Sequence, residues 1–293
     1  MLIDFDKIIE QIEFHIENPE SFSYKLPIFN GLYNFKKGRT TYFAGIPSHG
    51  KSTFVFELLI QLTEKHGLKH VLVAPEEGTA AELYITILCM ITGLQNRSNA
   101  FNRLTKEVFY KNIAYLKSHF HIYDLGEKSV SPYKILEDIK EYIIEHKIDT
   151  LTLDPWNELT HDFSIGGGRQ DIYLEKVLGD IRLFSRANKI HTFIVAHPRT
   201  LQKSKDGGKY EPPTAYEFSG GGAWYAKADG IICVYRPEEF SEVFKEQTKV
   251  EIIIQKAKRG IGKKGIINLD FNLQTSRYIE LDKPIENNFT APF

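Results

Sequence analysis

The stretch GIPSHGKS, residues 45–52, decides the fold that we expect for this chain. It matches G-x-x-x-x-G-K-[ST], the pattern of a phosphate-binding loop. The residues before it, TTYFA at 40–44, include β-branched and aromatic side chains and predict a buried strand. Residues 53–66, which follow it, have the length and apolar spacing of a helix. A strand, a glycine loop and a helix in this order favour a nucleoside-triphosphate site over an ordinary Gly/Pro turn.

The residue types of this loop explain the chemistry that we expect from it. Gly45 and Gly50 let the backbone turn tightly, so that successive N–H groups can surround phosphate oxygens. The helix that begins near Lys51 directs the positive end of its dipole at the same anion. We expect Lys51 to reach the β- and γ-phosphates and the Ser52 hydroxyl to bind Mg²⁺, so the expected cofactors are ATP and Mg²⁺. The predicted nucleotide-binding residues are Gly45, Ser48, His49, Gly50, Lys51, Ser52 and Thr53.

Composition places few limits on function. The 293 residues are long enough for one large α/β domain, and the formal net charge of −1 means that any nucleic-acid binding needs a local basic surface. Cys89 and Cys233 both lie in apolar runs and are predicted to be reduced core residues, with no disulfide or metal cluster. No apolar run approaches the ~18–20 residues that span a bilayer. The start of the chain is acidic and does not resemble a signal peptide. We therefore expect a cytoplasmic protein without a membrane partner.

Strand and helix patterns alternate from residue 40 onward, which predicts βαβ units and a mostly parallel twisted sheet with helices on both faces. Ligands of such sheets bind at the carboxyl ends of the strands. Beyond residue 248 the pattern changes to strands joined by a basic glycine turn. The predicted strands are 40–45, 70–75, 120–124, 150–154, 191–197, 230–236, 249–257 and 264–272, and the predicted helices are 51–66, 79–92, 104–117, 132–146 and 170–188.

Residues 5–17 form a separate amphipathic pattern, with apolar side chains at 5, 8, 9, 12 and 16 on one helical face. Asn18-Pro19 ends this helix. Its apolar face must pack either on its own domain or on a neighbouring subunit. We therefore divide the chain into an N-terminal helix and connector at 1–27 and an ATPase domain at 28–293.

Three of the predicted strands end in polar residues suited to catalysis. Asp154 ends the apolar strand LTLD and is predicted to hold Mg²⁺ through water, in a strand that we expect beside the phosphate loop. Glu76 is the first acid after strand 70–75 and is predicted to activate the attacking water. The alternative for Glu76 is a solvated helix N-terminus. His197 ends strand 191–197, where it can sense the γ-phosphate or be structural.

Two glycine-rich basic loops, 164–169 and 201–222, follow strands and suit contacts to phosphates. The alternative is that both are unstructured and solvated. The predicted contact residues are Arg169, Lys203, Lys205 and Lys209. A third basic segment, Lys256 to Arg259, lies at a late strand end, where a cation could complete a neighbouring subunit's ATP site.

The whole set resembles the Twinkle and phage primase-helicase branch of the DnaB-like replicative helicases, which have a RecA-like P-loop NTPase fold. The resemblance covers residues 28–270. It is carried by the phosphate loop, by Glu-Glu at 76–77, by LDPWNEL at 153–159 and by AHPR at 196–199. FSG at 218–220, AKADG at 226–230 and Tyr235-Arg236 support it further.

The resemblance implies a ring-forming DNA helicase, commonly of six subunits, with ATP between protomers. Glu76 would be the catalytic base, Asp154 the Mg²⁺ acid and His197 the γ-phosphate sensor. The two basic loops would grip single-stranded DNA in the central channel, and the helix at 5–17 would pack on the adjacent subunit. RecA- or RadA-like filament formation and an ATP-gated adaptor or loader are the alternative functions.

The sequence departs from the family pattern in two respects. The family's finger segment reads roughly Lys-x-Arg-Gly, whereas here Lys258 occupies the usual arginine register and Arg259 follows it. Successive strand residues face opposite ways, so either could reach the phosphate. We favour Arg259 because its planar fork suits phosphate. No primase or collar domain precedes residue 28, so we expect a separate primase or loader.

Overall fold

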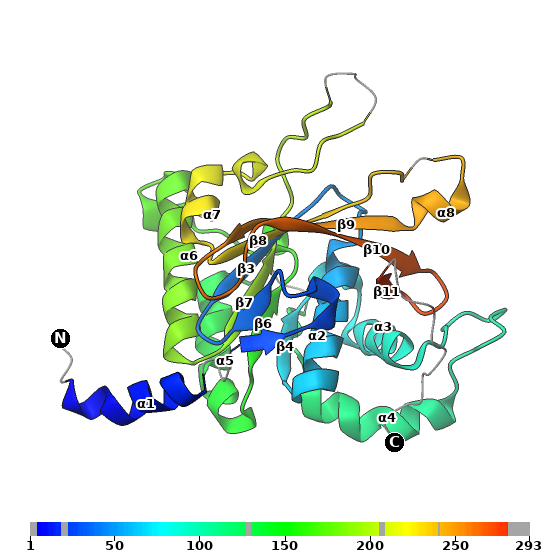
Figure 1. The fold of residues 1–293 in the computed structure, drawn as a ribbon, viewed down its shortest axis with the longest axis horizontal. Helices are drawn as coiled ribbons and strands as arrows, with labels where there is room; N and C mark the ends of the chain where they lie inside the picture. The colour runs from blue at the N-terminus through cyan, green and yellow to red at the C-terminus, as the bar shows by residue number, and fades with distance from the viewer. Residues whose placement is uncertain (1–4, 19–22, 127–129, 205–208, 240, 281–293) are drawn as a thin grey trace.

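A nine-stranded sheet runs through the centre of the structure, which is a computed structural model that describes residues 5–18, 23–126, 130–204, 209–239 and 241–280. Its strand order is β11-β10-β9-β8-β3-β7-β6-β4-β5 (Figure 1). The strands from β8 to β5 are parallel, whereas β9, β10 and β11 are antiparallel. The strands are β3 (Thr40–Ala44), β4 (His70–Val73), β5 (Phe120–Ile122), β6 (Thr150–Leu153), β7 (His191–Val195), β8 (Gly230–Tyr235), β9 (Lys249–Ala257), β10 (Gly265–Asn272) and β11 (Arg277–Glu280).

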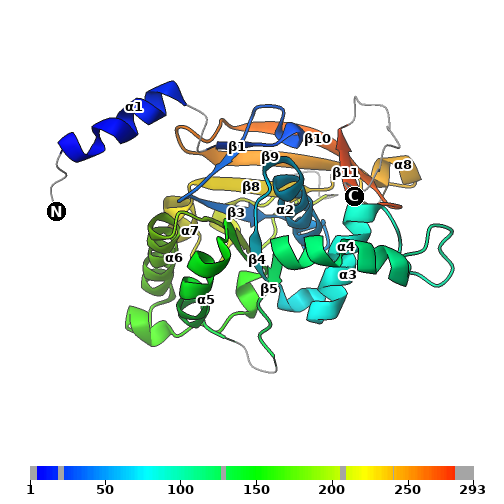
Figure 2. The ribbon, with the colours of Figure 1, turned by 90° about the horizontal axis from the view of Figure 1, so that it is seen from below.

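Helices cover both faces of the sheet (Figure 2). One face carries α2 (Lys51–His66), α3 (Ala80–Thr92) and α4 (Lys106–His119), and the other carries α5 (Pro132–His146), α6 (Gln170–Ala187) and α7 (Gly221–Lys227). Local sequence sets their ends. A capping box between Thr79 and Glu82 begins α3, and left-handed Gly67 and Gly93 end α2 and α3. The expected α/β fold with antiparallel strands near the C-terminus is confirmed.

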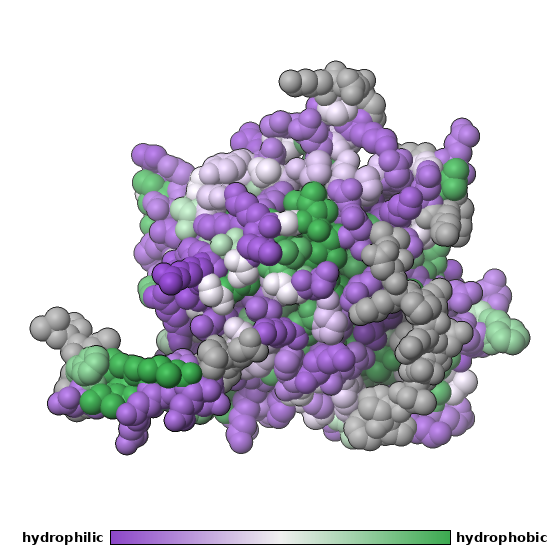
Figure 3. Space-filling model, viewed as in Figure 1, coloured by the Kyte–Doolittle hydropathy of each residue, from purple (hydrophilic) through white to green (hydrophobic). Residues whose placement is uncertain are grey.

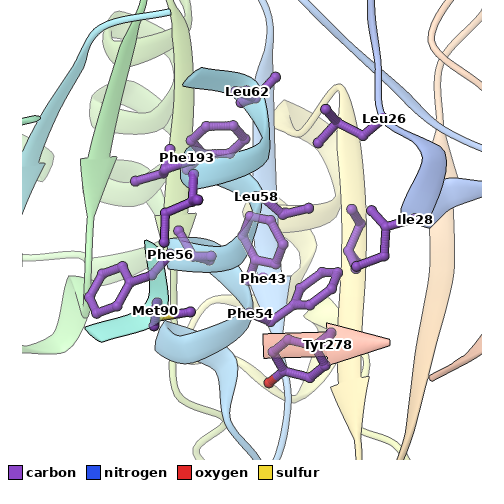
Figure 4. Packing of buried hydrophobic residues seen from close by; sticks show 14 of the residues in the cluster. Leu26, Ile28, Phe43, Phe54, Phe56, Leu58, Leu62, Met90, Phe193 and Tyr278 are labelled. Atoms are coloured by element: carbon purple, nitrogen blue, oxygen red, sulfur yellow. The ribbon is translucent and has the colours of Figure 1, made fainter. Parts of the chain in front are cut away.

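The sheet separates two apolar cores, so its central strands are buried on both faces. Phe43 of β3 packs toward Phe54 of α2, and Phe54 lies 5.2 Å from the ring of Tyr278 in β11 (Figure 4). The adjacent Tyr42 points to the opposite face, where its ring lies 5.3 Å from that of Trp224. A continuous apolar run rather than an alternating one is typical of such a strand, and it explains the sequence of β3.

Three expectations from the sequence are wrong. The strand that carries Asp154, β6, does not lie beside β3, because β7 pairs with both and lies between them. Strand order depends on how each crossover packs, and hydrophobic periodicity does not record it. Cys89 is half-buried rather than a core residue, whereas Cys233 is buried as expected. The segment 201–222 is not one irregular loop, because it contains paired backbone, the short 3₁₀ turn Ala215–Glu217 and the start of α7.

The structure also contains elements that the sequence did not predict. A small hairpin of β1 (Ser23–Lys25) and β2 (Asn34–Lys36) lies in the connector before β3. The edge strand β11 and the short helix α8 (Phe244–Gln247) were not expected either. Each of these elements is only a single short stretch, too brief to give a periodic signal.

Helix α1 (Ile9–Glu17), preceded by the turn Asp6–Ile8, extends away from the body of the structure (Figures 1 and 2). Apolar side chains form a strip along it (Figure 3), and Phe5 and Ile16 are 65% and 73% exposed. The predicted helix is therefore present, and its apolar face lies in solvent. Within the described residues, no helix is both long enough and apolar enough to cross a membrane.

Candidate functional site

The phosphate loop joins the end of β3 to the start of α2, in the order that the motif requires. Gly45 has a φ of +153°, and a Cβ added there would lie 2.5 Å from the carbonyl oxygen of Val234. Gly50 has a φ of +82°, and a Cβ there would lie 2.9 Å from the Tyr278 hydroxyl. Both positions therefore need glycine for space as well as for backbone conformation.

Lys51 is buried in the hollow of this loop. Its Nζ donates a hydrogen bond to the Ile46 carbonyl oxygen at 3.1 Å, so the side chain folds back over the loop. Burial lowers the pKa of Lys51, and the negative charge of Asp154 opposes that shift. A buried cation held among backbone N–H groups is suited to bind the oxygens of a polyphosphate.

Asp154 follows β6 and reaches the phosphate loop although β7 lies between the two strands. Its side chain is 2% exposed and accepts a hydrogen bond from the Ser52 hydroxyl. Burial raises the pKa of Asp154 to about 7. Among the described residues, its Oδ2 has no hydrogen-bond partner. A serine hydroxyl and an orphaned buried carboxylate oxygen together form the ligand set that Mg²⁺ prefers.

Glu76 and His197 lie close together at the same edge of the sheet. The turn Pro75–Glu77 after β4 carries Glu76, whose Oε2 is 3.9 Å from His197 Nε2. Burial and the neighbouring carboxylate of Glu158 raise the pKa of Glu76. Burial and the positive charge of Lys51 lower the pKa of His197. A half-exposed carboxylate with a raised pKa beside a phosphate site has the properties of a general base.

The motif LDPWNEL supplies two further residues of this site. Asn157 Oδ1 accepts a hydrogen bond from the His197 backbone N–H at 2.9 Å, which fixes the end of β7. Glu158 forms a hydrogen bond with Glu76. Neither residue was predicted to have a role, although both lie in the quoted motif and within a few residues of Asp154.

A cavity of about 360 Å³ lies beside the phosphate loop, between the start of α2 and strands β9 to β11. Ser48 and Thr53 line it together with Arg236 and Phe271. On its floor, the Tyr278 hydroxyl donates to the Gly50 carbonyl oxygen at 3.0 Å. The predicted nucleotide-binding residues Ser48, His49 and Thr53 thus border one continuous hollow.

The basic segment after β9 lies at the other edge of the sheet. Ala257 of β9 pairs with Gly230 at the start of β8, whereas the phosphate loop follows the ends of β3 and β8. Lys258 Nζ lies 3.0 Å from buried Asp229, which also binds Arg39 and Arg182. Arg259 is exposed and has no ion-pair partner among the described residues.

The predicted DNA-contact residues occupy one end of the molecule, and the structure pairs most of them. Arg169 forms an ion pair with Asp171 at 2.6 Å, and Lys209 forms one with Glu238 at 2.7 Å. Lys203 lies 5.6 Å from the centre of the Tyr210 ring. Lys205 lies outside the described residues. Ser219 donates a hydrogen bond to Gln170, so the two predicted loops meet.

The fold and these motifs agree with three comparisons. A family model described as "DnaB-like helicase C terminal domain" matches residues 28–280. The chain is 26% identical over 243 residues to the "Twinkle homolog protein, chloroplastic/mitochondrial" of Arabidopsis thaliana, with 80% of this chain and 34% of that protein covered. It therefore spans about a third of that relative's length.

Two solved structures share the fold at 15% identity. One, described as an isolated "ATPase Domain", superposes with a TM-score of 0.74 over 96% of this chain and 100% of the other. A second, titled "The Structure Of A DnaB-Like Replicative Helicase And Its Interactions With Primase", superposes with a TM-score of 0.70 over 96% of this chain and 68% of the other. These matches confirm the RecA-like fold and the resemblance found from the sequence. The chain belongs to the DnaB-like helicase C-terminal domain family.

Proposed function

We propose that this protein is an ATP-dependent replicative DNA helicase that assembles into a ring and translocates on single-stranded DNA. One observation carries the proposal. Lys51, Ser52, Asp154, Glu76 and His197 converge at the carboxyl edge of the sheet, while the exposed cation Arg259 lies at the opposite edge. A site that is complete except for a cation, on a chain that carries that cation elsewhere, is suited to share active sites between neighbouring subunits.

Within one subunit, Lys51 and the loop N–H groups bind the β- and γ-phosphates. Ser52 and Asp154 hold Mg²⁺, which neutralises charge on the phosphate oxygens when it is bound. Glu76 accepts a proton from the attacking water, and His197, fixed by Asn157, contacts the γ-phosphate. The cavity beside Ser48 and Thr53 receives the nucleoside.

Arg259 of one subunit approaches the phosphates bound by the next. Asp229 keeps Lys258 within its own subunit through an ion pair at 3.0 Å, and it keeps Arg39 and Arg182 there too. This pairing leaves Arg259 as the better finger, which supports the choice made on chemical grounds. Lys258 then fixes the turn that presents Arg259.

The exposed helix α1 docks on a neighbouring copy of the chain. A groove of about 630 Å³ between α3 and α4 has apolar walls that include Leu88 and Phe109. Arg103, Lys106 and Lys117 lie on its rim. Helix α1 carries an apolar strip flanked by acids such as Glu10 and Glu13. Matching shape and opposite charge therefore favour this helix as the occupant.

The two basic loops contact the DNA backbone, which makes binding largely independent of base sequence and sensitive to salt. The first test is ATP hydrolysis with and without single-stranded DNA, for the wild type, Lys51→Ala and Glu76→Gln. Hydrolysis that DNA stimulates in the wild type and that both variants lose supports a DNA motor. Hydrolysis that DNA leaves unchanged favours an adaptor or loader instead.

Unwinding then separates the helicase from a filament. A helicase opens a forked duplex in an ATP-dependent reaction, whereas a RecA-like filament coats single strands and leaves the fork closed. Electron microscopy of the same samples distinguishes rings from filaments.

A further inference from the structure

The segment Tyr235–Glu239, at the end of β8, lies directly against the phosphate loop. The Arg236 backbone N–H donates to His49 Nδ1 at 2.9 Å. Because Nδ1 accepts this bond, the ring hydrogen lies on Nε2, which donates to Glu239 at 3.0 Å. Burial lowers the pKa of His49 against the opposing effect of Glu239, which favours the neutral ring. The phosphate loop and this segment are thus joined through both nitrogens of one buried side chain.

The same segment holds the predicted DNA loop on its other side. Two arms of that loop, 202–204 and 209–211, pair through backbone hydrogen bonds of 2.8 Å from Ser204 to Lys209 and from Glu211 to Gln202. The Tyr235 hydroxyl donates to the Tyr210 carbonyl oxygen at 2.7 Å. Glu238, the neighbour of the residue that binds His49, forms the ion pair with Lys209.

A cavity of about 540 Å³ separates the phosphate loop from the arms, with the segment along its wall. The arms therefore meet the nucleotide site through a few polar contacts and not through a packed core. Polar contacts across a cavity can change partners without repacking apolar side chains. Lys209 has two possible partners in particular, the Glu238 carboxylate or a phosphate of DNA.

We propose that His49 and Tyr235 are positioning residues that couple nucleotide binding in the phosphate loop to the DNA affinity of the 202–211 arms. Phosphate binding reorients the His49 ring, the ring moves Arg236 and Glu239, and Glu238 then releases Lys209 to DNA. The bound nucleotide favours the state in which Lys209 is free, so it strengthens DNA binding. This inference rests on the proposed function, because it assumes that the arms bind single-stranded DNA.

The test measures the affinity of the full chain for a fluorescent oligo-dT, with and without a non-hydrolysable ATP analogue and Mg²⁺. We expect the analogue to strengthen wild-type binding by roughly tenfold, within the usual range of coupling between sites. Tyr235→Phe removes one hydroxyl, and His49→Asn keeps an acceptor for Arg236 but loses the donor to Glu239. Both should reduce the effect of the analogue to about twofold, mainly by weakening DNA binding in the presence of the analogue.

Glu238→Gln gives an effect of opposite sign. It releases Lys209 without nucleotide, so binding in the absence of the analogue should strengthen several-fold and approach the value measured with it. Damage to the fold would weaken binding in both conditions instead. Tyr84→Phe is the matched control, since it also removes a hydroxyl bonded to a carbonyl oxygen, at 2.9 Å from Phe120, and lies away from the site. It should behave as the wild type.

The outcomes separate the inference from the proposed function. A wild type that does not bind oligo-dT overturns the proposed function and this inference with it. A wild type that binds DNA equally with and without the analogue overturns the inference alone. The inference is also overturned if the wild type is coupled and both Tyr235→Phe and Glu238→Gln remain as coupled as Tyr84→Phe.

Discussion

Arg259 and Lys51 lie at opposite edges of one sheet, so a single subunit cannot bring them to the same phosphate. Lys51 is buried in the loop after β3, whereas Arg259 follows β9, whose end pairs with the start of β8. Under the proposed function, each ATP site therefore takes Lys51 from one copy and Arg259 from the next. The residues of the two halves can be inactivated separately.

Lys51→Ala and Arg259→Ala should each reduce hydrolysis strongly, Arg259→Ala by on the order of 10³-fold, as for other arginine fingers. Mixing the two variants should restore a measurable part of the activity. At some interfaces the intact loop of an Arg259→Ala subunit meets the intact Arg259 of a Lys51→Ala subunit. Steady-state hydrolysis of mixtures at varied ratios checks this. Mixtures no more active than the average of their components would show that Arg259 acts within its own subunit.

Lys258→Ala is the matched variant for the adjacent residue. Asp229 binds Lys258 in its own subunit, so its loss should impair the presentation of Arg259 and reduce activity less than Arg259→Ala does. If Lys258→Ala is the more damaging of the two, Lys258 is the finger, as the family register implies.

Strand β11 connects the end of the described chain to the phosphate loop. The Tyr278 hydroxyl donates to Gly50, and Arg277 binds Glu57 of α2 at 2.6 Å. We expect Tyr278→Phe to weaken binding of ADP with Mg²⁺ by up to about fivefold, because it removes one hydrogen bond worth about 1 kcal/mol from the loop. Titration calorimetry checks this, with Tyr142→Phe on α5 as the control. Equal affinities for both variants would exclude a role for this hydroxyl.

Motifs that follow a strand were predictable from the sequence, and contacts between distant elements were not. Asp154, Glu76 and His197 each end or follow an apolar strand, and parallel strands bring such ends to one edge. Tyr278 reaches Gly50 across 228 positions of the chain, and Arg236 reaches His49 across 187. Those contacts depend on the order of the strands, which periodicity does not encode. That order also explains why β7, and not β6, lies beside β3.

Two buried histidines link the stability of the whole molecule to pH. His70 bonds to Thr63 and Thr150, and burial lowers its pKa to about 3. His191 bonds to Thr41, and burial lowers its pKa to about 4. The charged neighbours are His119 and His121 for the first, and Asp229 and Arg39 for the second.

Both folded-state pKa values lie below 6.5, so the unfolded chain takes up protons first as the pH falls. Stability from these groups is complete above about pH 6.5 and decreases below it by about 1.4 kcal/mol per pH unit for each histidine, until the folded pKa is reached. Chemical unfolding between pH 7 and pH 5 checks this. His191→Gln should reduce the slope by one proton, while the exposed His66→Gln should not. Equal slopes in both variants would contradict the assignment.

Assembly is the property in which the exposed helix α1 and the groove between α3 and α4 should meet. Replacing Ile9 and Ile16 with Asp puts charge on the apolar strip, which is exposed in the single chain and buried in the proposed contact. The double variant should fold as the wild type does but sediment as smaller species, with loss of DNA-stimulated hydrolysis. Ile144→Asp is the control, because Ile144 is 70% exposed on α5.

Charge exchange tests the partner surface itself. Glu10→Lys with Glu13→Lys should weaken assembly, because these cations would face Lys106 and Lys117 on the rim of the groove. Adding Lys106→Glu and Lys117→Glu should restore it. Sedimentation across a range of salt concentrations checks both, and the defect should diminish at high salt as screening weakens the repulsion. Rescue requires that α1 of one copy lie in the groove of another. If the four-residue variant assembles no better than the two-residue one, α1 packs elsewhere.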